Sequence, residues 1–112
     1  MNMPIIKNCL KIEGDLVDES GSKGLLYRQI ISKGNECPLG VVYNDVAPGG
    51  NTKDHSHEGF HITYVVKGNG QVRSGDDVHE INQGDLIYLK PFEPHCFFNT
   101  GDTIMRLLGI QG

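Results

Sequence analysis

Four histidines offer the clearest chemistry in this sequence. His55 and His57 are two residues apart, so both imidazole rings lie on one face if the segment is extended. His61 follows four positions later, and His95 comes directly after Pro94, at the start of another predicted strand. Imidazole is the commonest protein ligand for transition metals, because it binds through a neutral ring nitrogen of intermediate softness. These four side chains are therefore candidate ligands for a metal ion.

The spacing of these histidines does not establish a metal site by itself, since a single histidine is more often a surface or hydrogen-bonded residue. We interpret His79, between Val78 and Glu80 beside a predicted turn, as such a surface residue. Glu58 and Glu93 flank the candidate ligands and are expected to be solvated loop residues. The sequence shows no nucleophilic triad and no paired carboxylates suited to acid–base catalysis, so no catalytic residue is assigned.

The elements that must position these histidines are predicted to be strands. Short runs of β-branched and aromatic residues are separated by turn-forming residues, and no window of ten or more residues has helical spacing with start and stop signals. Many short strands with frequent turns indicate an all-β sandwich or barrel. Segments 67–70 and 74–77 have the composition of hairpin turns, and 13–23 is expected to be a loop or short turn. The predicted strands are 5–12, 25–31, 39–46, 61–66, 71–73, 78–81, 86–89, 96–98 and 103–108.

Alternation along these strands predicts which side chains surround the candidate site. If His61 points inward, Thr63 does so too and Tyr64 points outward. Phe97 shares the face of His95 and is expected to be an apolar wall, whereas Cys96 turns away. We therefore predict that Thr63 and Phe97 line a pocket that is mostly apolar and suits a small organic molecule.

Composition limits the remaining possibilities. A chain of 112 residues has room for one compact domain, and its net charge of −4, with scattered basic residues, argues against a nucleic-acid surface. There is no signal-peptide pattern and no apolar run of the ~18 residues that a membrane span needs. The three cysteines lack C-x-x-C spacing and are expected to be reduced, as in a cytoplasm. We expect a cytoplasmic protein whose partners are a small-molecule ligand and a second copy of itself.

The second copy is expected because a small barrel leaves sheet edges unpaired, and such edges favour association. The apolar opening segment, 5–12, is separated from the main strands by the polar segment 13–23, so it is able to reach a partner's sheet. We predict a symmetric homodimer, the commonest closed assembly of soluble chains.

Two segments of the sequence resemble the two motifs of the cupin family. Segment 49–68 resembles G-x5-H-x-H-x3-E-x6-G, with His61 where the glutamate is usual. Segment 84–99 resembles G-x5-P-x-G-x2-H-x3-N, with Lys90 in place of the proline and Phe92 in place of the glycine. The two motifs cover about half of the chain and occur in the family's order, so the resemblance is specific for the fold and the metal site, although not for a reaction.

The resemblance implies a single cupin domain over residues 1–112, folded as a double-stranded β-helix, or jelly-roll barrel. His55, His57 and His95 match the family's histidine ligands, and His61 stands in the place of its carboxylate ligand, as in cupins with four histidines. The alternative is that His61 does not bind the ion, which leaves a site of three histidines. The resemblance also implies structural roles for Gly68, Gly84 and Asn99.

One divalent transition metal is the implied cofactor. Manganese, iron and nickel accept six ligands readily, whereas zinc prefers four and copper binds tightly wherever it is available. The resemblance favours a metal-dependent oxidoreductase or dioxygenase that acts on a small chelating organic molecule. A binding module without catalysis, for a sugar or an acid, and a non-redox isomerase, lyase or cyclase remain alternatives, because this fold hosts many functions.

Overall fold

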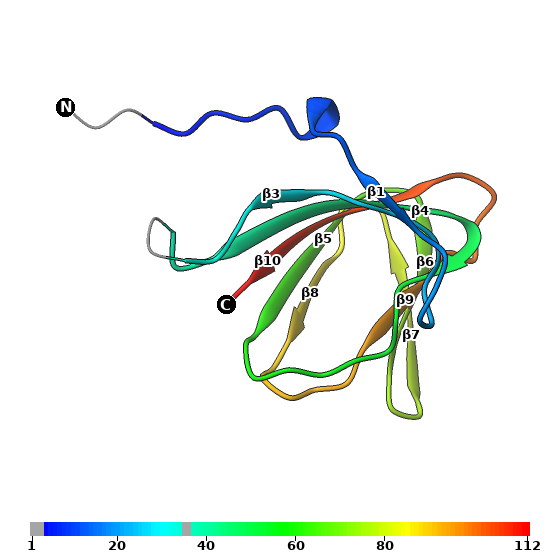
Figure 1. The fold of residues 1–112 in the computed structure, drawn as a ribbon. Helices are drawn as coiled ribbons and strands as arrows, with labels where there is room; N and C mark the ends of the chain where they lie inside the picture. Colours follow the sequence, from blue (N-terminus) through cyan, green and yellow to red (C-terminus); the bar gives the residue numbers. More distant parts are fainter. Residues whose placement is uncertain (1–3, 35–36) are drawn as a thin grey trace.

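The protein folds into one curled antiparallel sheet, shown in Figure 1. The computed structural model describes residues 4–34 and 37–112. Its only helix in these residues is the 3-10 turn η1 (Cys9–Lys11). The strands are β1 (Asp15–Val17), β2 (Lys23–Tyr27), β3 (Gln29–Ile31), β4 (Gly40–Asn51), β5 (His61–Lys67), β6 (Asn69–Ser74), β7 (Asp77–Asn82), β8 (Leu86–Leu89), β9 (Cys96–Phe98) and β10 (Met105–Gln111).

The order of the strands curls the sheet around an interior, with β7 and β8 at its two ends. Along the main path the order is β7-β6-β9-β4-β10-β5-β8, and β4 also pairs with β2 and β3. β4 is the longest strand, at 12 residues, and bends so that its two ends pair with different neighbours. This arrangement confirms the predicted all-β, jelly-roll barrel, since the chain crosses from one part of the barrel to another between β5 and β6, between β7 and β8, and between β8 and β9 (Figure 1).

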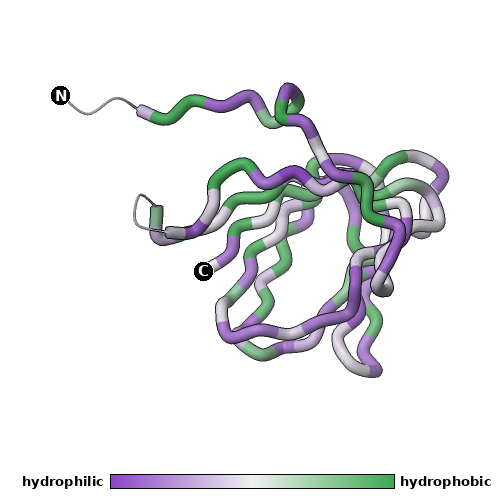
Figure 2. Tube along the Cα trace, viewed as in Figure 1, coloured by the Kyte–Doolittle hydropathy of each residue, from purple (hydrophilic) through white to green (hydrophobic). Residues whose placement is uncertain are grey.

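The core lies inside the barrel because apolar residues alternate with polar ones along the strands, as the hydropathy colours in Figure 2 show. In β10, the residues Met105, Leu107 and Gly109 are buried while their neighbours are less so. Met105, Val46 and Val65 are the largest side chains that are completely buried. The core cluster comprises Leu25, Val46, Val65, Val72, Ile81, Leu89, Phe97, Met105 and Leu107.

The turn predicted at 74–77 is confirmed, since β6 and β7 pair from Asn69–Asn82 to Ser74–Asp77. The hairpin predicted at 67–70 is wrong. β5 pairs with β10 and β8, whereas β6 pairs with β7 and β9, so Gly68 is the corner at which the chain crosses from one part of the barrel to another. Gly68 has a φ of 84°, and a Cβ there would lie 2.6 Å from the carbonyl oxygen of Ile104, so no side chain fits.

Three further predictions need correction near the start of the chain. The strand predicted over 25–31 is interrupted at Arg28, which separates β2 from β3. The segment 13–23 is not only a loop, because it contains β1, which pairs with β2. Residues 4–12 form no strand but an extended arm that ends in η1 (Figure 1). The arm contacts the sheet through the Lys7 Nζ, which donates to the carbonyl of Ile30 in β3 at 2.7 Å. Residues 1–3 lie outside the described part of the chain.

No helix in the described residues is long and apolar enough to cross a membrane.

Candidate metal centre

Two loops at one end of the barrel carry the histidines. His55 and His57 lie in the loop between β4 and β5, and His95 lies directly before β9. The two loops are joined by an isolated antiparallel bridge, in which the N–H of His55 donates to the carbonyl of His95 at 3.2 Å and the N–H of His95 donates to that of His55 at 3.0 Å. The backbone therefore holds His55 and His95 side by side, although they are far apart in the sequence.

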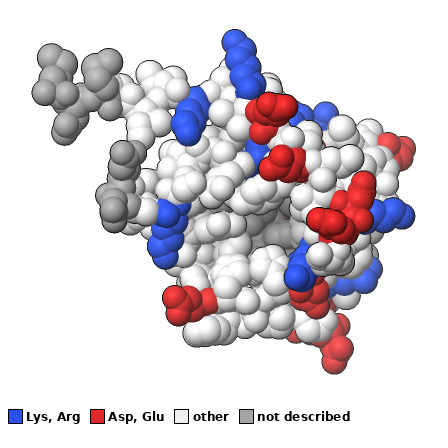
Figure 3. Space-filling model, viewed as in Figure 1, with Lys and Arg blue, Asp and Glu red and all other residues white. Residues whose placement is uncertain are grey.

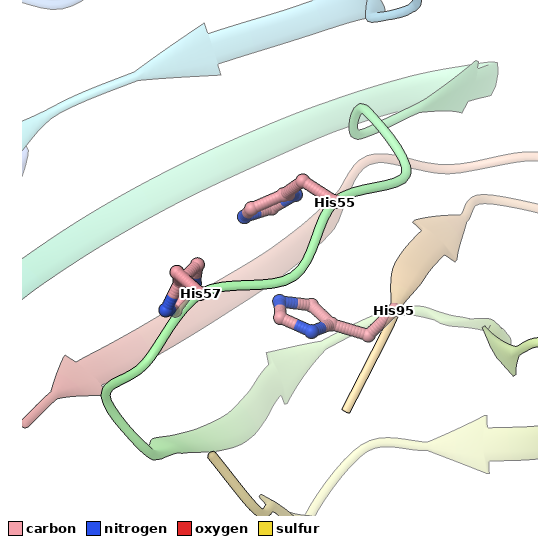
Figure 4. A group of neighbouring side chains, drawn as sticks. All are labelled: His55, His57 and His95. Atoms are coloured by element: carbon pink, nitrogen blue, oxygen red, sulfur yellow. The ribbon is translucent and has the colours of Figure 1, made fainter. Parts of the chain in front are cut away.

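Three imidazole rings converge at this bridge. The rings of His55, His57 and His95 point toward one another in Figure 4, and one ring nitrogen from each lies within 4.8 Å of the others. Three such nitrogens around a common point have the spacing and chemistry of a transition-metal site.

Hydrogen bonds orient two of these rings for coordination. The Nδ1 of His55 lies 2.7 Å from the carbonyl oxygen of Lys53, and the Nδ1 of His95 lies 3.0 Å from that of Glu93. A carbonyl only accepts, so each Nδ1 carries the hydrogen and each Nε2 keeps its lone pair free. Backbone carbonyls commonly select the tautomer of metal-binding histidines in this way.

His61 lies beside this cluster, at the start of β5. Its ring centroid is 4.2 Å from that of His57 and 4.9 Å from that of His95. The side chain is buried, and its Nε2 has no hydrogen-bond partner in the described part of the chain. A buried polar atom without a partner costs about 1–3 kcal/mol, so this nitrogen needs an explanation.

His57, His61 and His95 have lowered pKa values, which favours the neutral form that metal coordination requires. Burial, then the neighbouring charges of His57, His95 and His55, lowers the pKa of His61 from 6.5 to about 4. Burial is also the largest cause that lowers the pKa of His57 and of His95, and the Glu93 carbonyl partly opposes it at His95. At neutral pH these rings therefore offer lone pairs rather than positive charges.

The loop before His95 has the two departures from the cupin motif. Phe92 stands where the family has glycine, and it adopts a φ of 64°, the left-handed conformation that glycine tolerates best. Its N–H donates to the carbonyl of His57 at 2.7 Å, so this strained residue also holds the other loop of the site. Glu93, expected to be solvated, accepts from the N–H of Lys90 at 3.0 Å and thereby tightens the turn.

A cavity of about 160 Å³ opens beside the histidines into the barrel. Figure 3 shows the hollow where the barrel opens toward the viewer, lined mainly by uncharged residues. Thr63 and Phe97 line this cavity, together with His55, His61 and His95. The lining also includes Tyr27, Asn44 and Gln111, which the sequence analysis does not predict. Predicting them requires both the alternation of side chains along β2, β4 and β10 and the register in which these strands pair.

The other residues singled out in the sequence lie away from the cavity. His79 is exposed on β7, and Cys96 is buried outside the cavity lining, with its thiol pKa raised by burial. Asn99 is buried, and its Nδ2 donates to the carbonyls of Val46 and Thr103, at 2.8 Å each. Asn99 therefore joins β4 to the loop between β9 and β10.

Comparison with known families agrees with this geometry. The cupin domain family Cupin_2 matches residues 42–110, which include all four candidate ligands. This is more than half of the chain, so the protein belongs to the cupin family. Cupins often bind a metal ion, and the cluster of three histidines has the donor set for one.

The individual relatives are more distant. The chain is 31% identical over 64 residues to an uncharacterized protein of Methanocaldococcus jannaschii, a match that covers 56% of this chain and 51% of that protein. It thus spans about half the length of this curated relative. The polyketide cyclase RemF from Streptomyces resistomycificus has a similar structure, with a TM-score of 0.82, 25% identity, and coverage of 97% of this chain and 79% of the cyclase chain.

The fold also resembles a predicted oxalate decarboxylase from Thermotoga maritima. Here the TM-score is 0.86 at 23% identity, with coverage of 96% of this chain and 97% of the other. This similarity concerns the fold.

Proposed function

We propose that this protein is a metal-dependent enzyme in which His55, His57, His61 and His95 hold one divalent transition-metal ion. The reaction proposed first is oxidation of a small organic molecule that chelates the ion through oxygen, of the dioxygenase kind. The observation that carries the four-histidine site is the buried, unpartnered Nε2 of His61 beside the three convergent rings. Coordination would satisfy this nitrogen, which no protein group in the described chain does.

The donor set determines what chemistry the ion supplies. A bound divalent ion acts as a Lewis acid toward anionic oxygen and, if it is redox-active, exchanges electrons with dioxygen. Four neutral imidazoles leave its double charge uncompensated, so the site favours anionic oxygen ligands such as an enolate, an oxo acid or a catechol.

The residues of the chain orient the ligand and exclude water. The carbonyls of Lys53 and Glu93 fix the rings of His55 and His95, so little rearrangement is needed on binding. Phe97 and Leu107 provide apolar walls of the cavity, which favour an organic ligand over water.

The proposed ion is manganese, iron or nickel, which accept six ligands and so leave two positions beyond four histidines. Zinc and copper are further candidates, because the order of affinities favours them over manganese at nitrogen sites.

A second candidate is a non-redox reaction of the cyclase kind. It is favoured by the similarity to a polyketide cyclase, at 25% identity over 97% of this chain. Such a reaction would use the same ion only to stabilise an enolate, with no oxygen consumed.

Elemental analysis of protein purified without an affinity tag, followed by oxygen uptake, tests these candidates. We expect close to one metal ion per chain, and oxygen uptake when iron-loaded protein meets its substrate from a panel of diketones, flavonols, catechols and oxo acids. A product formed without oxygen uptake would select the cyclase reaction. Tight binding without turnover of any compound would contradict an enzymatic function and favour a binding module.

A further inference from the structure

Two hydrogen-bond donors in the cavity, the Tyr27 hydroxyl and the Asn44 amide, have no acceptor in the part of the chain that the structure describes. Tyr27 and Asn44 line the cavity from β2 and β4, among apolar residues such as Leu25 and Leu107. The register of these strands pairs Leu26 with Asp45 and therefore sets Tyr27 opposite Asn44. The two polar side chains thus form one patch on the cavity wall, and neither is a candidate metal ligand.

The orientation of the Asn44 amide is determined by its other end. Its Oδ1 accepts from the N–H of Arg28 at 3.2 Å. The opposite orientation would bring an amide N–H₂ against that backbone N–H, two donors facing each other. The Nδ2 amino group is therefore directed away from Arg28, and it has no acceptor in the described part of the chain.

Arg28, which orients Asn44, is itself held firmly. Its carbonyl accepts from the N–H of Tyr43 at 2.8 Å, and its guanidinium donates to Asp45 at 3.0 Å. Asp45 also accepts from Arg106 at 2.7 Å. This network lies outside the barrel, because Asp45 and Tyr43 alternate with the inward Asn44. The Asn44 donor is accordingly preorganised before any ligand binds.

The Tyr27 phenol supplies the second donor. Burial raises its pKa, and no hydrogen bond to the phenol opposes this effect in the described chain. The hydroxyl therefore remains protonated and able to donate at neutral pH. Its aromatic ring packs on the core cluster, which limits its movement.

The size of the cavity limits the size of the chemical group that can reach these two donors. About 160 Å³ is close to the ~150 Å³ of an apolar cavity that holds a benzene molecule, so a single six-membered ring or an equally small chain fits. We infer that the part of the ligand inside the cavity has this size and carries an acceptor oxygen, apart from the chelating oxygens, that receives hydrogen bonds from Tyr27 and Asn44. This inference rests on the proposed function, because the chelating end is assigned to the metal.

The inference is tested by calorimetry with two probes on nickel-loaded protein in the absence of oxygen, because nickel accepts six ligands and so leaves two positions for a chelating probe beyond four histidines. Catechol offers the chelating oxygen pair alone, and 3,4-dihydroxybenzaldehyde adds a carbonyl acceptor to the same pair. In Tyr27→Phe we expect affinity for the aldehyde to fall about tenfold relative to the wild type, as for the loss of one buried hydrogen bond. Affinity for catechol should change less than twofold, and so should the nickel content.

Two further variants separate recognition from general damage. Asn44→Asp keeps the acceptor for Arg28 but replaces the cavity donor by an acceptor, so it should weaken the aldehyde more than catechol. Tyr88→Phe removes a phenol from an exposed position outside the cavity and should change neither affinity.

The outcomes distinguish this inference from the proposed function. Catechol binding that disappears when nickel is removed supports the metal-dependent site. Equal losses for both probes, or no change in Tyr27→Phe and Asn44→Asp, would overturn the role of this donor pair and leave the proposed function standing. Failure of both probes to bind wild-type protein would contradict the proposed function, and the inference with it.

Discussion

The role of His61 decides whether the metal site has three or four histidine ligands. It occupies the position at which the cupin motif has a carboxylate, and its buried Nε2 lies beside three rings that already converge. Burial and the neighbouring imidazoles lower the pKa of His61, because both disfavour the protonated form. The same two causes make His61 suitable as a ligand, since only the neutral ring binds a metal ion.

Metal content of single variants tests the ligand set. We expect His57→Ala and His61→Ala to lower the affinity for zinc by at least about tenfold, since each removes one coordinating nitrogen. His61→Glu should retain the metal, because it restores the usual cupin carboxylate. His79→Ala is the matched control and should bind as the wild type does. Full affinity in His61→Ala would reduce the site to three histidines.

The same residue predicts how the metal-free protein responds to acid. His61 has a pKa of about 4 in the folded state against 6.5 ordinarily, so the unfolded chain takes up a proton first as the pH falls. Stability is therefore fully present above pH 6.5 and is lost toward pH 4, by up to roughly 3 kcal/mol. Urea denaturation at several pH values measures this loss. His61→Phe should show a smaller loss over the same range; an identical slope would contradict the prediction.

At the scale of the elements, two loops carry three of the four histidines, and His61 lies at the start of β5. The bridge between His55 and His95 joins the two loops, and the N–H of Phe92 adds a third backbone hydrogen bond to His57. In the loop before His95, Phe92 has a positive φ, a backbone conformation that suits glycine better than phenylalanine.

Phe92→Gly should consequently stabilise the protein. Glycine removes the left-handed strain of about 1–2 kcal/mol, and part of this gain is offset by the greater freedom of the unfolded chain. The ring is 68% exposed, so little burial is lost. We expect the melting temperature to rise by a few degrees. Phe92→Ala is the control, because it removes the ring but keeps a Cβ; if both variants melt together, strain at this position is not significant.

At the scale of the whole molecule, the outer face of the sheet formed by β4, β10, β5 and β8 is unusually apolar. The register aligns two rows of side chains across these strands. Both rows point outward, because they alternate with the core positions. Leu86, Tyr88 and Tyr64 are 66%, 57% and 41% exposed. The rows are Val41, Ile110, Ile62 and Tyr88, and Tyr43, Leu108, Tyr64 and Leu86.

We expect a second copy of the chain to bind at this face. The homodimer remains a prediction. An apolar patch without charge matches its own copy about a two-fold axis, and a stable dimer needs on the order of 800 Å² from each chain. Sedimentation should show a dimer that Leu86→Glu weakens. Val78→Glu, at a similarly exposed position on β7, is the control. Deleting residues 1–12 should also weaken the dimer if this segment contributes to the interface. A wild-type protein that is monomeric at micromolar concentration would contradict the prediction.

Much of this protein follows from local sequence. Short runs of β-branched and aromatic residues between turn-forming residues predict β5, β8 and β9 almost residue for residue, and the turn between β6 and β7 is encoded by its own polar residues. The residue types and motif spacing also select His55, His57 and His95 as a group, since these properties can be read without knowing how distant strands pair.

What only the tertiary structure decided is which strands become neighbours. Gly68 looks like part of a hairpin turn, yet it is a corner, because its strands find better partners elsewhere in the barrel. The same long-range register brings Tyr27 opposite Asn44 and buries the Nε2 of His61. Pairing of strands depends on burial and hydrogen bonds between residues far apart in the chain, and for that reason no local pattern contains it.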